Sequence, residues 1–249
     1  MGLLRTRLYK LGLLSVSIAV GFASGPAVSQ SNSGTNGLQP LTPVAVARGS
    51  EVLIKTYDPL VSSVRLIAPA GAGITSACGT TLKDQLGEAF YCTKDKTIYI
   101  SNKTLNVVAE RFGIAAVAAI VAHEFGHARQ HALTGFLSSI VWTNAVDELQ
   151  ADCVAGVYMR EATPIKLSDA QINQAKAFMA AVGDYEFFNK DWHGTPQMRV
   201  MAYSLGYQGG SLGSCAASKT FNWKEVLNGN PSGLNELLQQ GPKLLPGLQ

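Results

Sequence analysis

The sequence has few charged residues, and neither sign of charge is in real excess. Only 15% of its 249 residues are Asp, Glu, Lys or Arg, against 47% hydrophobic residues, which suits one domain with a sizeable core. The 20 Lys and Arg exceed the 17 Asp and Glu only because of Arg5, Arg7 and Lys10 near the N-terminus. The remainder is balanced, so nothing supports nucleic-acid binding through a charged surface, and we expect no nucleic-acid partner.

Cysteine is scarce, and no C-x-x-C pair occurs, which argues against a cysteine-based zinc site. The four cysteines are an even number, as expected for disulfides in an exported chain. Sequence alone allows three pairings. We favour Cys78 with Cys92, which closes a local loop, and Cys153 with Cys215, which ties a helix to the end of the domain.

The apolar run at the N-terminus, residues 11–22, is shorter than the roughly 20 residues that a membrane-spanning helix needs. It follows three basic residues and precedes Ala27-Val28-Ser29, a small-x-small cleavage signal. We therefore predict a signal peptide over residues 1–29 and export to the periplasm or the medium. An uncleaved membrane anchor is the alternative. No cysteine stands near the cleavage site, so lipoprotein processing is not indicated.

Composition divides the rest of the chain. Residues 30–50 are polar and rich in Gly and Pro, which predicts a flexible linker. We place the domain at residues 51–217 and a tail without assignable chemistry at 218–249. We expect short strands at 52–55 and 64–67, and a β-hairpin of strands 89–92 and 97–101.

Helices are expected in the second half of the domain. Residues 102–111 predict a short helix, and Ser168 with Gln171 forms a capping box that starts a helix to about Val182. Thr195 can cap another helix, with Pro196 in its first turn, that runs to about Leu205. A loop is expected over residues 206–214.

The most informative stretch is His123-Glu124-Phe125-Gly126-His127, an H-E-x-x-H pattern. On an α-helix, residues four apart share a face about 6 Å apart along the axis, so both imidazoles can reach one tetrahedral ion. Glu124 can then touch a water on that ion without binding the metal. The apolar residues 114–122 predict that this helix is buried. The pattern alone also fits an ordinary helix surface.

A third ligand is needed, because catalytic zinc usually has three protein ligands and one open position. In a predicted helix over residues 143–160, Glu148 and Asp152 share a face and Asp147 points elsewhere. Glu148 completes a His2Glu set, and Asp152 is placed to orient a ligating imidazole. A solvated acidic edge is the alternative, but the segment is too apolar for it.

Other polar residues have less specific settings. His193 lies in a loop where it can project into a cleft, or simply form a loop hydrogen bond. His131 continues the spacing from His127, but no glutamate follows His127, so we expect His131 at the helix edge. Three arginines are interpreted as salt-bridge partners rather than substrate clamps: Arg129, Arg160 and Arg199.

A set of motifs occurs in order over residues 77–215: Cys78-Gly79, Phe90-Tyr91-Cys92, Ile98-Tyr99-Ile100, Arg111-Phe112-Gly113, the H-E-x-x-H stretch, Glu148-Leu-Gln-Ala-Asp-Cys153, Val182-Gly183-Asp184, and His193-Gly194 with Arg199. In this set the chain resembles the putative neutral zinc metallopeptidases, and the wider gluzincins that pair H-E-x-x-H with E-x-x-x-D. The resemblance implies a mainly helical α+β, zincin-like domain with Glu148 as third ligand. It also implies that His193 helps to hold the transition state.

We therefore expect an exported zinc metallopeptidase with one catalytic Zn²⁺, held by His123, His127 and Glu148, and a peptide or protein substrate. Glu124 is the expected general base, and Tyr99 or Ile100 is expected to line the strand to which substrate adds. The rival from another class is a catalytically silent, zinc-stabilised binding or assembly module associated with the cell envelope. Glu124 argues against it, since a structural site needs no base. A cell-wall amidase is a second rival.

Overall fold

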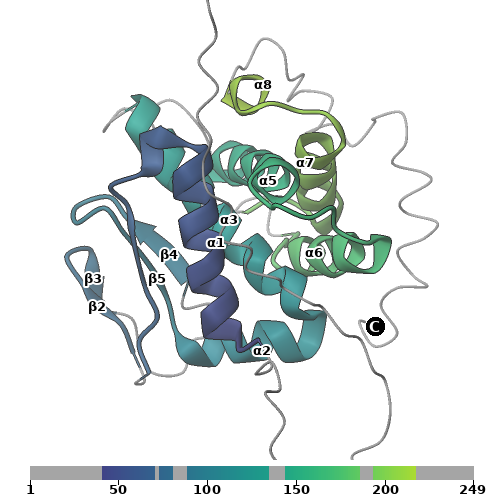
Figure 1. Ribbon diagram of the computed structural model, residues 1–249. Helices are drawn as coiled ribbons and strands as arrows, with labels where there is room; N and C mark the ends of the chain where they lie inside the picture. The colour runs from purple at the N-terminus through teal and green to yellow at the C-terminus, as the bar shows by residue number, and fades with distance from the viewer. Residues whose placement is uncertain (1–40, 71–72, 81–88, 135–143, 186–192, 217–249) are drawn as a thin grey trace, which may run out of the picture. The chain divides into compact units, whose positions relative to one another are not determined.

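The computed structural model describes residues 41–70, 73–80, 89–134, 144–185 and 193–216 (Figure 1). The predicted signal peptide and the predicted tail lie outside these residues. Helices dominate the described part and two small sheets complete it, which confirms the expected mainly helical α+β fold. Within the described ranges, no helix is both long and apolar enough to cross a membrane.

Helix α3 (Ile114–Thr134) lies at the centre of the described structure (Figure 1). Four helices pack around it: α1 (Pro43–Tyr57), α2 (Asn102–Phe112), α5 (Asn144–Glu161) and α6 (Asp169–Ala181). The first nine residues of α3 are all Ala, Val or Ile, and most are buried. A helix that is apolar on every side is stable only where neighbours cover it. The predicted buried helix is confirmed.

The start of α3 is fixed by its neighbours. Gly113 ends α2 with φ 93°, in the left-handed region that favours glycine, and the chain turns directly into α3. The backbone N–H of Ala115 donates to Oε1 of Gln174 on α6 at 3.3 Å. This side chain therefore satisfies one of the N–H groups that have no partner inside the helix.

Three strands form the main sheet in the order β1-β5-β4: β1 (Arg65–Ile67), β5 (Thr97–Ile100) and β4 (Ala89–Cys92). Strands β4 and β5 are the predicted antiparallel hairpin, and β1 runs parallel to β5. Ile98 and Ile100 pack into the helical core, while Tyr99 stacks on Phe90 in a small cluster on the opposite face. This alternation is the period-two pattern of a strand that is buried on both faces.

The position of β5 corrects one expectation. Because β5 is paired on both sides and Tyr99 and Ile100 are buried, neither residue can line a strand that receives a substrate. The hairpin strand without a partner on its outer side, among the strands described, is β4.

A second hairpin, β2 (Thr75–Ser76) with β3 (Gly79–Thr80), lies beside the main sheet (Figure 1). The disulfide Cys78–Cys92 joins its turn to the end of β4. Asp95 adds a second link, since its carboxylate accepts from the Ala77 N–H at 3.2 Å and from the Tyr99 hydroxyl at 2.9 Å. The predicted local pairing of Cys78 with Cys92 is confirmed.

Helix α1 overturns two expectations at the N-terminal end. Residues 43–50 are helical rather than a linker, and residues 52–55 continue the helix instead of forming a strand. Thr42 caps the helix by accepting from the Ala45 N–H at 3.1 Å, and Pro43 stands in the first turn. Ala47 and Ile54, two turns apart, are buried in the core. Burial of this face outweighs the β-branched and glycine residues that indicated otherwise.

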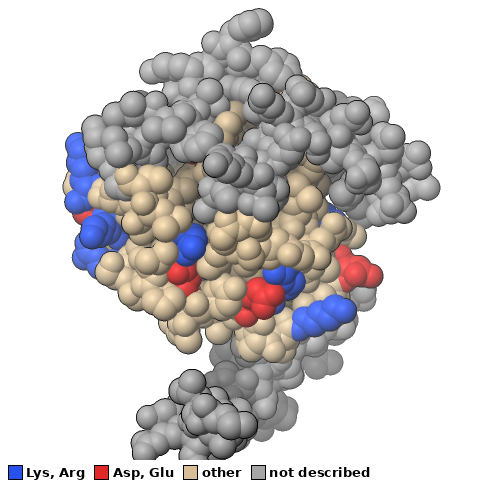
Figure 2. All heavy atoms as spheres, turned by 90° about the horizontal axis from the view of Figure 1, so that it is seen from above, with Lys and Arg blue, Asp and Glu red and all other residues tan. Residues whose placement is uncertain are grey.

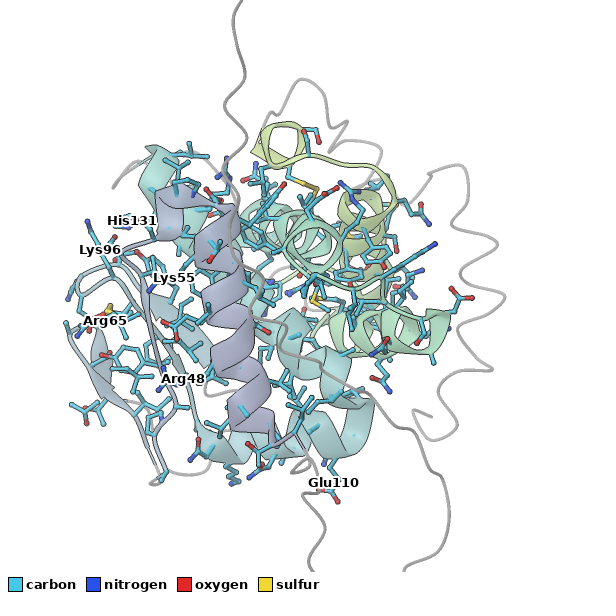
Figure 3. The ribbon with its side chains drawn as sticks, in the orientation of Figure 1. Arg48, Lys55, Arg65, Lys96, Glu110 and His131 are labelled. Atoms are coloured by element: carbon cyan, nitrogen blue, oxygen red, sulfur yellow. A yellow bond between two sulfur atoms is a disulfide. The ribbon has the colours of Figure 1, made fainter. Side chains whose placement is uncertain are left out.

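Helix α1 also covers the outer edge of β1. The Leu66 N–H donates to Glu51 Oε1 at 3.1 Å, and the Leu66 carbonyl accepts from Arg48 Nη1. Figure 3 shows Arg48 and Lys55 on the side of α1 that faces the strands. Two side chains therefore satisfy backbone groups that a further strand would otherwise pair with.

The C-terminal helices follow the predicted caps. The Ser168–Gln171 capping box starts α6, and Thr195 caps α7 (Pro196–Gln208). The loop expected over residues 206–214 is wrong: α7 continues to Gln208, and α8 (Leu212–Ala216) follows. Gly206 does not end the helix, because it lies where α7 meets α5.

Helices α5 and α7 approach through glycine. A Cβ added at Gly206 would clash with the Cys153 carbonyl oxygen, and one added at Gly156 would clash with the Tyr203 carbonyl oxygen. The predicted disulfide Cys153–Cys215, confirmed here, ties α8 to α5. Arg160 of α5 donates to three carbonyls at the end of α7, those of Gly206, Tyr207 and Gly210.

The surface reflects the low charge content. On the face seen in Figure 2, most described atoms belong to uncharged residues, and acidic side chains lie close to basic ones. Glu51 forms ion pairs with Arg48 and Lys55 on α1.

Candidate metal centre

Helix α3 places two imidazoles at one point. The Nε2 atoms of His123 and His127 are 3.1 Å apart, with the rings nearly perpendicular. His123 is buried and His127 is partly buried. The four-residue spacing thus directs the same ring nitrogen of each histidine toward a common position.

Helix α5 brings a carboxylate to the same position. Glu148 Oε2 lies 3.3 Å from His123 Nε2, and Glu148 Oε1 lies 3.4 Å from His127 Nε2. One ligand atom from each of these residues lies within 4.8 Å of the other two. The structure therefore brings together the three residues that the sequence analysis selected as metal ligands.

The close contact of α3 and α5 depends on a residue inside the motif. A Cβ at Gly126 would lie 2.8 Å from the Ala151 Cα, so only glycine lets the two helix backbones approach to this distance. Gly126 stands next to His127, and Ala151 next to Asp152. The close approach of the two helices therefore lies beside the polar groups of the site.

Asp152 lies behind His123, fully buried. Its Oδ1 is 2.8 Å from His123 Nδ1, the ring nitrogen that faces away from Glu148. A carboxylate in this position fixes the ring orientation and leaves Nε2 for a metal. Its placement corresponds to the orienting role expected for it.

Arg199 of α7 joins the two carboxylates of α5. Its Nη1 donates to Glu148 Oε2 at 2.7 Å and its Nη2 to Asp152 Oδ1 at 3.0 Å. An ion pair between Arg199 Nε and Asp152 Oδ2 at 2.5 Å completes the contact. Arg199 is a salt-bridge partner, as expected, but its partners are site residues, and nothing in the sequence pattern identified them.

Gln130 was not singled out from the sequence. Its Oε1 lies 2.9 Å from Nδ1 of His127, and its Nε2 donates to the Asp147 carbonyl at 2.7 Å. The signal that could have found it is spacing, since Gln130 is three residues after His127 on the same helix face.

Glu124 is buried beside the histidines, with 4% of its surface exposed. Its Oε2 has no hydrogen-bond partner in the part of the chain that the structure describes. Burial raises the pKa of this carboxyl, although the adjacent His123 and His127 oppose the shift. An acceptor oxygen in this state suits a group that takes up a proton.

His193 is not among the residues whose ligand atoms converge, and its side chain is 51% exposed. Its Nδ1 is 3.2 Å from Asp184 Oδ2, and its carbonyl accepts from Arg199 Nη1 at 3.4 Å. Arg199 thus links this loop to Glu148. Asp184 belongs to the Val182-Gly183-Asp184 motif, for which the sequence alone predicts no function.

The charges of the centre depend on one another. Burial alone lowers the pKa of His123, but hydrogen bonds to Asp152 and Glu148 raise it to about 10. Burial alone raises the pKa of Glu148, but His127 and Arg199 hold it well below its usual range. The carboxylates therefore favour the protonated form of both imidazoles, since, against the effect of burial, the pKa of His127 is raised as well, by Glu148.

The remaining polar candidates have structural partners. His131 lies toward the end of α3 (Figure 3), with Nδ1 3.0 Å from the Tyr91 hydroxyl of β4. Arg129 pairs with the buried Asp58 at 2.5 Å, and Tyr158 donates to the same carboxylate oxygen. Arg160 pairs with Glu161 at 2.7 Å, so the salt-bridge interpretation of both arginines is confirmed.

This combination of fold and site defines a class. Two histidines one turn apart on a buried helix, a glutamate from a second helix and a buried carboxylate with an oxygen that has no hydrogen bond among the described residues are features of zinc metallopeptidases. The chain belongs to the family described as "Putative neutral zinc metallopeptidase", which matches residues 70–218. The resemblance found in the sequence is confirmed.

Curated relatives carry no functional description. An uncharacterized protein of Mycobacterium bovis and one from each of two Mycobacterium tuberculosis strains are 33% identical over an alignment 157 residues long, which covers 51% of this chain. The chain spans about half the length of these relatives, 53%. No solved structure matches the chain significantly.

Proposed function

We propose that this chain is an exported metallopeptidase that hydrolyses peptide bonds in a peptide or protein substrate with a single catalytic zinc ion. One observation carries the proposal: the ligand atoms of His123, His127 and Glu148 converge within 4.8 Å, and the adjacent Glu124 has an oxygen without a hydrogen-bond partner among the described residues. Membership of the family supports it.

The donor set fits the ion. Two imidazole nitrogens and one carboxylate are a usual ligand set of catalytic zinc, and they leave a position open for water. His123 and Glu148 would bind in orientations held by Asp152 and Arg199. When bound, zinc supplies Lewis acidity and lowers the pKa of its water toward about 7.

The residues of the chain carry out the proton transfers. Glu124 accepts a proton from the attacking water at its free Oε2, and later delivers the proton to the leaving amine. The raised pKa of Glu124 supports this double role, because a carboxyl that is too acidic would not hold the proton between the two steps.

His193 is proposed as a hydrogen-bond donor to the oxyanion of the tetrahedral intermediate. Its Nδ1 contacts the Asp184 carboxylate, which leaves Nε2 for another partner. The hydrogen bond from Arg199 to its carbonyl supports a loop position near Glu148.

The test is cleavage of a diverse peptide library by the zinc-loaded protein, read by mass spectrometry, with Glu124→Gln beside it. Cuts that disappear in the variant would establish a zinc peptidase. Absence of cuts from folded, zinc-loaded protein would contradict peptidase activity toward free peptides. The same assay is then run on cross-linked cell wall. Cleavage there would indicate an amidase, and no cleavage would indicate a catalytically silent envelope module.

Export is part of the proposal. The basic and apolar residues before position 29 support it, and so do the two disulfides, which persist in oxidising compartments. Intact-mass analysis of protein from a cell fractionation tests it. A mature chain that lacks residues 1–29 is expected outside the cytoplasm, whereas a full-length chain in the membrane fraction would indicate an uncleaved anchor.

A further inference from the structure

We propose that Gln130 positions His127 for metal binding by fixing which ring nitrogen of His127 carries the proton. The inference rests on the proposed zinc site and adds a residue that acts through a ligand. Gln130 follows His127 by three residues on α3, so the two side chains lie on the same face. Their contact, Gln130 Oε1 to His127 Nδ1, is 2.9 Å.

The orientation of the Gln130 amide follows from its other end. Its Nε2 lies 2.7 Å from the backbone carbonyl oxygen of Asp147 on α5. A carbonyl oxygen can only accept a hydrogen bond, so the group that faces it must be the NH2 of the amide. A second contact, 3.3 Å to Gln150 Oε1, takes the other N–H. The oxygen of the amide therefore faces His127.

This orientation determines the state of the imidazole. An amide oxygen also only accepts, so His127 Nδ1 must carry the hydrogen and donate it. A neutral imidazole with its hydrogen on Nδ1 has its lone pair on Nε2. His127 Nε2 is the atom that lies 3.1 Å from His123 Nε2 and 3.4 Å from Glu148 Oε1. Gln130 thus presents the ligand nitrogen of His127 toward the candidate metal position.

The two histidines are therefore held in different ways. Asp152, a buried carboxylate neutralised by Arg199, holds His123. Gln130 is neutral, and it is held by the backbone of the residue directly before Glu148. One chain of hydrogen bonds runs from His127 through Gln130 to Asp147. Gln130 therefore connects His127 to the backbone of α5 directly before Glu148.

A purely structural role, as a tie between α3 and α5, would give some of the same contacts. Two substitutions separate the roles. Gln130→Glu keeps an acceptor for His127 but loses the donor to the Asp147 carbonyl. Gln130→Met loses both at similar side-chain length. Gln174→Met is the matched control, because it makes the same chemical change in a glutamine that bonds the other end of α3.

Two measurements are needed. Zinc affinity is measured by competition with a chromophoric chelator. The His127 tautomer is read from the ring ¹⁵N shifts of metal-free protein at alkaline pH, where the ring is neutral. Gln130→Met should weaken zinc binding by roughly 10–100-fold and lose the Nδ1–H tautomer. Gln130→Glu should keep the tautomer and bind zinc more tightly than Gln130→Met. Gln174→Met should lower the Tm and leave zinc affinity unchanged.

Wild-type zinc affinity and tautomer in Gln130→Met would overturn the proposal. Equal zinc affinity and tautomer in Gln130→Glu and Gln130→Met would also overturn it, because the hydrogen bond to Asp147 would then be the important contact of Gln130. The tautomer is read without metal, so a wild-type protein that binds no zinc would refute the proposed function while the NMR result still decides the role of Gln130.

Discussion

The guanidinium of Arg199 binds the carboxylate of Glu148 across the α5–α7 interface, with 2.7 Å between Nη1 and Oε2. The same guanidinium binds Asp152, one turn further along α5. A single cation from a third helix therefore compensates both carboxylates that surround the histidines.

Replacing Arg199 should destabilise the metal-free protein strongly. Arg199→Met leaves two buried carboxylates without their cation, which costs about 3–5 kcal/mol of unfolding free energy when one partner of a buried pair is removed. Urea unfolding of metal-free protein measures this. Lys55→Met is the control: its partly exposed pair with Glu51 should contribute about 1 kcal/mol or less. Equal losses in the two variants would contradict the role given to Arg199.

Different substitutions should abolish metal binding and proton transfer. Glu148→Ala removes a ligand and should lose most of the zinc, whereas Glu124→Gln should keep the zinc and lose roughly 10²–10⁴-fold in kcat. Zinc content by atomic absorption and peptide cleavage are measured on the same samples. Full zinc content in Glu148→Ala would show that the ligand set is wrong.

Zinc affinity should rise with pH well beyond the usual range of histidine. The pKa of His123 is raised to about 10, so below that pH the metal-free protein holds a proton that zinc must displace. The affinity should therefore increase by about tenfold per pH unit for each proton released, and should still be rising above pH 7.5 or so. Calorimetry in two buffers of different ionisation enthalpy counts the protons. Affinity that is constant above this pH would disprove the raised pKa.

A single methyl group should disturb the α5–α7 contact. Gly206→Ala places a Cβ against the Cys153 carbonyl, and overpacking of this kind costs about 1–3 kcal/mol. Gly49→Ala in α1 meets no atom within 4 Å and should instead stabilise by about 0.5–1 kcal/mol. Thermal unfolding of both variants tests the difference, and a neutral Gly206→Ala would mean that the helices can separate freely.

The two disulfides should differ in their effect on stability. Cys153–Cys215 spans 62 residues and Cys78–Cys92 spans 14, which in the chain-entropy account gives about 4 and about 3 kcal/mol. Double Cys→Ala variants of each pair, compared by urea unfolding, measure the order. Intact mass with and without reductant should show both bridges in protein from an oxidising compartment, and four free thiols there would refute them.

The helices and the ligand candidates could be predicted because their causes are local. Residues 114–122 form an apolar run, His123 and His127 stand one turn apart, and Ser168 begins a capping box, all of which are visible within a few residues. Helix α1 could not be predicted in this way, because it is stabilised by burial of Ala47 and Ile54 against distant elements.

Long-range contacts account for the other differences. Glycine is typical of loops, yet Gly206 lies inside α7, because the α5 backbone passes directly beside it. Arg199 takes its role from α5, and the contact of Gln130 with the Asp147 carbonyl depends on α5 as well. The ligand set and Asp152 were visible in the pattern, whereas the contacts of Arg199 depend on which helices meet.

The contacts of Arg48 and Glu51 with Leu66 determine where the main sheet can grow. They give β1 the hydrogen-bond partners that a neighbouring chain would supply, so that side is closed to intermolecular pairing. Among the described strands, β4 then keeps the outer side that can accept an extended peptide. The two edges of the sheet therefore differ. Side chains of α1 cover the edge at β1, so an added strand would pair with β4, at the other edge.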